Sequence, residues 1–238
     1  MGEAAVRLYE QAAVRQVAGD VLRPGGLTLT RRALTVAALP AGARVLDVGC
    51  GVGATVSLCR SDFALNAVGL DLSAILLAEG RAQDPPRPLL QATALQLPFA
   101  DGAFEAVLAE CSLSLVTDWN QALSDVARVL RPGGLCIVSD MYAAPRDGAP
   151  VTAPLQCCLA GARSRDEIET QFTAHGFTLV RWEDHTPALK QFAARLIWEH
   201  GSLAAFWDCA GVTQTARAAL PAHPGYFLAW TRKGSRKQ

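Results

Sequence analysis

Three glycines at alternate positions, Gly49, Gly51 and Gly53, follow a short apolar run, "ARVLDVG" (43–49). Glycine at the junction of a strand and a helix permits a tight turn and lets the backbone approach a ligand closely. The dinucleotide fingerprint is G-x-G-x-x-G, whereas the spacing here is G-x-G-x-G with Asp47 just before it. A carboxylate is unfavourable beside phosphate and favourable beside a cation. The loop therefore indicates a ligand with positive charge near Asp47.

A second carboxylate, Asp71, lies 20 residues after Gly51, in the next apolar run, "NAVGLDLS" (66–73). A carboxylate at the end of the second strand of such a fold can accept hydrogen bonds from both hydroxyls of an unphosphorylated ribose. The glycine loop and Asp71 together favour a ligand that contains a nucleoside.

Cysteines are the other residues that could do chemistry. The chain has seven, at 50, 59, 111, 136, 157, 158 and 209, without a C-x-x-C spacing. No metal-ligand spacing links them to the four histidines, so no metal site is predicted. Free cysteines are often buried, and Cys59 and Cys136 are expected in the core. Neighbours in a helix or strand point to different sides, so only one of Cys157 and Cys158 is expected to face a pocket.

Strands and helices alternate along the chain, which predicts an α/β fold with a doubly wound parallel sheet. Open sheets of this kind bind ligands at the carboxyl ends of their strands. The strands are expected at 43–49, 66–73, 87–93, 103–111, 135–141, 176–183 and 225–233, and helices at 4–18, 29–38, 53–61, 118–130, 164–175 and 187–209.

The chain resembles the class I S-adenosylmethionine-dependent methyltransferases over roughly 43–141. The glycine loop, "LPFADGAFE" (97–105) and "VARVLRPGGLCIVSD" (126–140) carry the resemblance. It implies S-adenosylmethionine as cofactor and a Rossmann-like seven-stranded sheet with a reversed last strand. It also implies an N-terminal helical segment or lid (1–40) and a methyltransferase domain (41–238) with a helical insertion at about 185–222.

The same resemblance implies roles for individual residues. Gly49 and Gly51 would line the methionine part, Asp47 would face its amine, Asp71 would bind the ribose and Leu72 would pack on the adenine. Many relatives carry an acidic residue where this chain has Thr93, so a weaker hydroxyl contact or a backbone contact to the adenine amine is expected there. The full expected cofactor set is Asp47, Gly49, Cys50, Gly51, Gly53, Asp71, Leu72, Thr93, Ala94 and Glu110.

The acceptor side resembles arsenite methyltransferases over about 109–180. Cys111 matches a cysteine of that family, and Cys158 in "QCCLAGA" (156–162) falls where the family holds trivalent arsenic. Soft thiolates suit such a centre, and its lone pair can attack a methyl group without a base. The family's cysteines before the glycine loop have no counterpart here. The catalytic candidates are Cys158, Glu110 and Cys111; the histidines are not expected to act as bases.

The sequence thus predicts S-adenosylmethionine-dependent methyl transfer to a small molecule, such as a thiol-bound metalloid or another soft nucleophile. The alternative is a partner subunit that binds the cofactor and does not catalyse. A zero net charge, from 22 basic and 22 acidic residues, argues against nucleic acid as the substrate. The lack of a long apolar run or secretory leader predicts a cytoplasmic protein that does not bind membranes. The acceptor's identity and the oligomeric state stay open.

Overall fold

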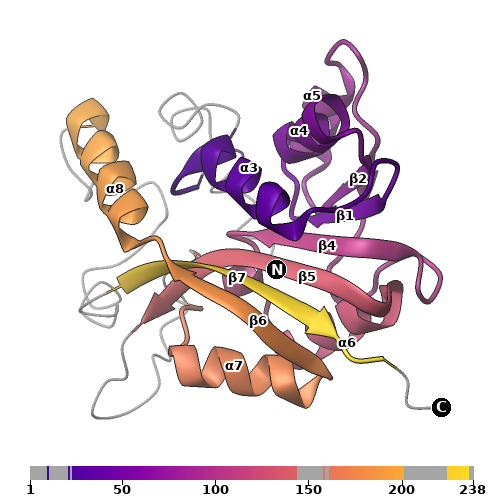
Figure 1. Ribbon diagram of the computed structural model, residues 1–238. Coiled ribbons are helices and arrows are strands. Elements are labelled where there is room, and N and C mark those ends of the chain that lie inside the picture. Colours follow the sequence, from indigo (N-terminus) through magenta and orange to yellow (C-terminus); the bar gives the residue numbers. More distant parts are fainter. Residues whose placement is uncertain are drawn as a thin grey trace.

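A seven-stranded sheet forms the centre of the molecule in a computed structural model, which describes residues 10, 21, 23–143, 158, 161–200 and 224–235. The strand order is β3-β2-β1-β4-β5-β7-β6 (Figure 1). Strands β1 to β5 pair in parallel, whereas β7 is antiparallel to both of its neighbours. The strands are β1 Arg44–Val48, β2 Asn66–Asp71, β3 Leu89–Gln91, β4 Phe104–Glu110, β5 Leu130–Ala143, β6 Phe177–Asp184 and β7 Pro224–Lys233. The predicted doubly wound fold with a reversed last strand is confirmed.

Helices cover both faces of this sheet, with α3, α4 and α5 on one side and α6 and α7 on the other (Figure 1). Each face therefore has its own buried hydrophobic cluster. The described helices are α3 Gly26–Ala37, α4 Ala54–Phe63, α5 Ala74–Arg81, the short 3-10 helix η1 Leu113–Leu115, α6 Trp119–Val129, α7 Arg165–Ala174 and α8 Thr186–His200. Because the central strands are buried on both faces, they read as apolar runs rather than alternating ones.

The helix starts are set by short polar side chains. The hydroxyl of Ser73 accepts from the backbone N–H of Leu76 at 3.1 Å at the start of α5. Ser164 and Glu167 form a reciprocal capping box at the start of α7. Such caps satisfy backbone donors that the first helical turn leaves without a partner. The helix expected at 164–175 accordingly begins at Arg165, directly after its cap.

The "LPF" segment is held in place by α6. The guanidinium of Arg128 donates to the carbonyl oxygens of Leu97 at 2.8 Å and Phe99 at 2.6 Å. The carboxylate of Asp125 accepts from the N–H of Leu97 and from Arg128. These contacts fix the loop that follows β3 against the C-terminal half of α6. The motif therefore has a structural role that its family resemblance alone does not explain.

Strand β5 is longer than the expected 135–141, because it begins at Leu130 and runs through "RPGG". A register shift opposite Phe104 and Ala106 accommodates the extra residues. Its far end continues to Ala143 because it pairs with β7 as far as Pro224. The helix expected at 4–18, apart from the helical Glu10, and the 201–209 part of the helix expected at 187–209 lie outside the described residues.

Helix α3 packs against the same face of the sheet as α4. The indole N–H of Trp230, in β7, donates to the carbonyl oxygen of Ala33 at 3.0 Å. Leu29, Ala33 and Leu34 are buried in the hydrophobic cluster on this face. The proposed boundary between a lid (1–40) and the domain that follows stays a prediction, as does the helical insertion at 185–222. Within the described ranges, no helix combines the length and apolar character needed to cross a membrane.

Candidate cofactor pocket and acceptor side

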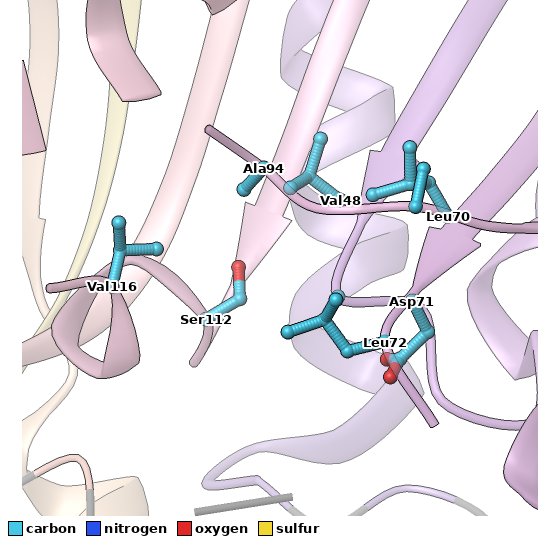
Figure 2. Close-up of a pocket in the computed structure, with 9 residues that line it drawn as sticks. Val48, Leu70, Asp71, Leu72, Ala94, Ser112 and Val116 are labelled. Carbon is cyan, nitrogen blue, oxygen red and sulfur yellow. The ribbon is translucent and has the colours of Figure 1, made fainter. Parts of the chain in front are cut away.

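A pocket opens at the carboxyl ends of β1 and β2, as the topology of the sheet predicts. Figure 2 shows Asp71 at one end of it and apolar side chains, including Val48 and Leu70, along the rest. The loops after β3 and β4 supply the other sides. The lining residues are Val48, Gly49, Leu70, Asp71, Leu72, Ala92, Ala94, Ser112 and Val116. Gly49, Asp71, Leu72 and Ala94 are therefore placed together, as the sequence predicts.

The Asp71 carboxylate, whose residue is 6% exposed, accepts two backbone hydrogen bonds. One comes from Gly51 N–H at 2.8 Å and the other from Ser73 N–H at 2.9 Å. Burial raises the pKa of Asp71, and these hydrogen bonds act in the opposite direction. A carboxylate offers about four acceptor directions. The acceptor directions that the backbone donors leave suit the hydroxyls of a ribose, so the residue fits the role predicted for it.

The glycine loop needs glycine for two different reasons. Gly49 has φ +80°, and a Cβ there would lie 2.5 Å from the Cβ of Ser112. Gly51 has φ +55°, and a Cβ there would meet nothing within 4 Å, so its side faces open space. Gly53 is the N-cap residue of α4. The loop thus brings backbone close to the pocket and leaves room beside Gly51 for a ligand.

Six of the ten expected cofactor residues are not among the lining residues of the pocket, and Cys50 and Thr93 are two of them. The sulfur of Cys50 packs toward β2, where a Cβ on Gly69 would lie 2.7 Å from it. The hydroxyl of Thr93 accepts from the N–H of Leu95 at 3.2 Å, and Thr93 does not line the pocket. A side-chain contact to the cofactor from either residue is therefore not favoured by this arrangement, although their backbones remain beside it.

Glu110 is occupied by a buried polar network. Its carboxylate accepts from the hydroxyls of Thr30 and Thr55, each at 2.9 Å, and pairs with Arg23 at 2.7 Å. The same guanidinium donates to Thr30 at 2.6 Å and to Thr55 at 2.8 Å. These residues join the segment before α3, α3 itself, α4 and the end of β4. Glu110 therefore holds elements together, and the roles predicted for it as a catalytic and cofactor-binding residue have no support from its contacts.

Asp47 is 3% exposed and lies beneath the glycine loop rather than on the pocket surface. Burial raises the pKa of Asp47 to about 8, with the carboxylate of Glu110 acting in the same direction and Arg23 against it. At neutral pH the carboxyl group is thus largely protonated. A cation bound nearby would favour its ionised form, which is the property expected of a residue facing the cofactor's amine.

The acceptor side brings Cys111 and Cys158 together. Their thiols are within hydrogen-bonding reach, and this contact, together with burial, raises the pKa of Cys111 well above its ordinary value. Nearby, Gly161 lies against η1, where a Cβ on it would be 1.7 Å from the carbonyl oxygen of Ser114. The sequence predicted these two cysteines separately, and the fold makes them neighbours. Cys157 and Cys209 lie outside the described residues.

Sequence reasoning missed two buried polar residues near this site. Asp140 is fully buried and accepts from Ser114 N–H at 2.9 Å, Ser114 Oγ at 2.6 Å and Met141 N–H at 2.8 Å. Burial raises its pKa to about 6. A charged residue inside the apolar run "LCIVSDM" (135–141) was the available signal. Ser112 lines the pocket, and its hydroxyl has no hydrogen-bond partner among the described residues; no sequence pattern pointed to it.

Comparison with known proteins agrees with this geometry. The family described as "Methyltransferase domain" matches residues 46–138. A demethylmenaquinone methyltransferase of Mycolicibacterium vanbaalenii is 40% identical over 167 residues, covering 60% of this chain and 72% of the relative. One from Beutenbergia cavernae is 38% identical over 141 residues, and the match covers 58% of each chain. The chain thus spans less than two thirds of the length of that relative.

Solved structures share the fold. Phosphoethanolamine N-methyltransferase 2 of Haemonchus contortus, solved with S-adenosyl-L-methionine, is 19% identical with a TM-score of 0.74, covering 97% of this chain and 57% of that one. The [4+2]-cyclase SpnF is 25% identical with a TM-score of 0.68, covering 87% of this chain and 80% of that one. The relatives' identity, the glycine loop and the Asp71 pocket lead to one conclusion. The chain belongs to the class I S-adenosylmethionine-dependent methyltransferases.

Proposed function

We propose that this protein transfers a methyl group from S-adenosylmethionine to a small-molecule acceptor. The observation that carries the proposal is the buried Asp71 carboxylate, which lies at the end of an apolar pocket and is held by backbone N–H groups. The cofactor, when bound, supplies an electrophilic methyl group on a sulfonium centre. The chain's own residues bind it, orient it against the acceptor and exclude water, which is most of what such a displacement requires.

For the acceptor, we propose a soft nucleophile held at the Cys111–Cys158 thiol pair, for which a trivalent metalloid is the simplest case. Two adjacent thiols suit a thiophilic centre such as a trivalent metalloid. As each sulfur binds, a hydroxide would leave the metalloid, take up the thiol proton and depart as water. The bound centre keeps a lone pair and needs no general base. Asp140, the buried carboxyl group next to the pair, need not act as a base in this reaction. Its oxygens already accept hydrogen bonds from Ser114 and Met141.

A quinol ring is the second candidate, favoured by the relatives that are 38% and 40% identical and are named demethylmenaquinone methyltransferases. A quinol offers a carbon nucleophile, so its acceptor site would not depend on the thiols. Replacing Cys158 should therefore abolish methylation of a thiol-held acceptor and leave methylation of a quinol unchanged.

Calorimetry with S-adenosylhomocysteine tests the cofactor part of the proposal. We expect Asp71→Asn to bind it about 10- to 100-fold more weakly than the wild type, since hydrogen bonds to a charged group contribute about 1.5–3 kcal/mol. The exposed Asp101→Asn variant is the control and should bind normally. A wild-type protein that does not bind the ligand at submillimolar concentration would refute the proposal.

Turnover with S-adenosylmethionine tests the acceptor. Arsenite with added thiol and a demethylmenaquinol analogue are offered to the wild type, Cys158→Ser and Cys157→Ser. A thiol-held acceptor predicts that Cys158→Ser loses arsenite methylation while its sequence neighbour Cys157→Ser keeps it. Methylation of the quinol alone, unaffected by Cys158→Ser, would favour the second candidate. Tight cofactor binding without turnover on either acceptor would favour the non-catalytic alternative.

A further inference from the structure

Ser112 has a buried hydroxyl that lacks a hydrogen-bond partner. It is 5% exposed, and among the described residues no group forms a hydrogen bond with its hydroxyl. A buried hydroxyl without a partner is unfavourable because it has lost its hydrogen bonds to water, so such groups call for an explanation. Ser112 lines the pocket at the carboxyl ends of β1 and β2, although the oxygen itself is covered. A ligand that enters this end of the pocket and displaces that cover would supply the missing partner.

The position of Ser112 in the pocket indicates which part of the ligand it meets. Figure 2 shows its oxygen directed toward Ala94, on the side away from Asp71. Leu72, Ala94 and Val116 make this part of the pocket apolar. A flat, largely apolar ring suits such a slot, while the ribose belongs at the carboxylate. Besides Asp71, Ser112 is the one residue with a polar side chain among those that line the pocket.

The position of Ser112 is also fixed by its surroundings. Gly49 lies so close that a Cβ there would be 2.5 Å from the Cβ of Ser112. The preceding residue, Cys111, donates its backbone N–H to the carbonyl oxygen of Ser139 at 2.7 Å. A hydroxyl held in place in this way needs little ordering when a ligand arrives, which favours binding.

Thr93, the hydroxyl expected to contact adenine, has a different position. Its oxygen accepts from the N–H of Leu95 and lies outside the pocket lining. The adenine slot would otherwise have no polar side chain in the described part of the chain. From the orphan hydroxyl and its location we infer that Ser112 hydrogen-bonds a ring nitrogen of the cofactor's adenine and thereby helps to select the purine. The inference rests on the proposed function.

Binding of S-adenosylhomocysteine and its purine-modified analogues tests the inference by calorimetry. Ser112→Ala should bind the parent ligand about three- to tenfold more weakly, as expected for one neutral hydrogen bond. Thr93→Ala is the matched control and should bind it as the wild type does. The 1-deaza, 3-deaza and 7-deaza analogues each lack one ring nitrogen. One of them should bind equally to the wild type and Ser112→Ala, because the partner atom is already missing.

Other outcomes are separately informative. A Ser112→Ala variant that binds the parent ligand as tightly as the wild type overturns the inference. So does a deficit that persists with all three deaza analogues but disappears with 5′-methylthioadenosine, since the contact would then be to the amino-acid part. A deficit shared by Thr93→Ala would assign the loss to loop packing. Failure of the wild type to bind S-adenosylhomocysteine would instead refute the proposed function itself.

Discussion

At the scale of single residues, the site concentrates buried carboxyl groups. Asp47, Asp71 and Glu110 all lie within the region of the glycine loop and are less than a tenth exposed. Of these three carboxyl groups, Glu110 is the one that forms an ion pair with Arg23. Asp71 is compensated by two backbone N–H groups, whereas burial keeps Asp47 largely protonated at neutral pH. The three carboxyl groups therefore meet the cost of burial in different ways.

Replacing Asp47 should change how stability depends on pH. Its pKa is about 8 in the folded protein, against an ordinary value of 3.8. Between these values the unfolded chain releases the proton and the folded chain keeps it, so the free energy of unfolding falls as pH rises. Below pH 3.8 both states hold the proton, and above pH 8 neither does. Asp47→Asn removes this effect.

Urea unfolding of the two proteins from about pH 4 to about pH 9.5 measures it. We expect the free energy of unfolding of Asp47→Asn to rise relative to that of the wild type across the window and then to level off. Asp140, whose pKa is about 6, contributes equally to both proteins, so the difference isolates Asp47. Parallel pH profiles would show that Asp47 is ionised in the folded protein.

At the scale of elements, α3 is joined to the cofactor region by a charged contact as well as by packing. The side chains of Arg23 and Glu110 are 12% and 4% exposed, and Thr30 and Thr55 complete their hydrogen bonds. The pair lies directly behind the glycine loop and connects the N-terminal segment to the end of β4. A change in this contact should therefore affect both stability and the shape of the loop.

Breaking this pair from one side should be more harmful than removing it. Arg23→Met leaves a buried carboxylate without its cation, which typically costs about 3–5 kcal/mol. The double variant Arg23→Met/Glu110→Met removes both charges and should recover part of that loss. Arg31→Met is the control, because Arg31 pairs with Asp62 on the surface with its side chain 52% exposed. It should cost at most about 1 kcal/mol.

Chemical denaturation of the four proteins gives these free energies directly. A double variant at least as unstable as Arg23→Met would mean that packing by the methylenes, rather than the unpaired charge, dominates the loss. An Arg23→Met variant no less stable than Arg31→Met would mean that the buried pair contributes little.

Gly161 sets the distance between the segment carrying Cys158 and the turn η1. In Gly161→Ala the new methyl group would lie 1.7 Å from the carbonyl oxygen of Ser114, so the two segments must separate. We expect a bifunctional thiol reagent to bridge Cys111 and Cys158 in the wild type and to do so much more slowly in Gly161→Ala. Peptide mapping identifies the bridge, and Cys158→Ser gives the background. An equal yield in both proteins would show that Gly161 does not hold the thiols together.

At the scale of the whole molecule, local patterns predict the sheet well. Each strand of the first half is an apolar run followed by a turn residue, and helices start at residues such as Ser73 and Ser164 that cap them. The Asp71 pocket follows from the same patterns, because the carboxyl ends of parallel strands meet at one edge of the sheet. These features depend on neighbours in sequence or on a repeated topology.

The features that the sequence does not reveal depend on single contacts between distant segments. Arg23 and Glu110 are 87 residues apart in a chain with 22 residues of each charge sign, so composition could not pair them. The orphan state of Ser112 depends on what all its neighbours do with their own donors and acceptors. Thr93 is not among the residues that line the pocket, and its hydroxyl accepts from the N–H of Leu95 in a local turn. These features depend on tertiary packing, so a short sequence pattern does not predict them.

A ligand that binds only the folded state should stabilise the whole chain while protecting one edge of the sheet. With S-adenosylhomocysteine at 100 times its dissociation constant, stability should rise by about 2.7 kcal/mol, which raises Tm by about 5–10 °C for a domain of this size. Hydrogen exchange should slow most in 48–53, 70–73, 92–97 and 112–116, the segments at the pocket. Helix α7 and strand β6 lie on the far part of the sheet (Figure 1) and should change only through global unfolding. Protection centred on α7 and β6 would place the ligand at another site, and a thermal shift without slower exchange at 48–53 would contradict binding at the glycine loop.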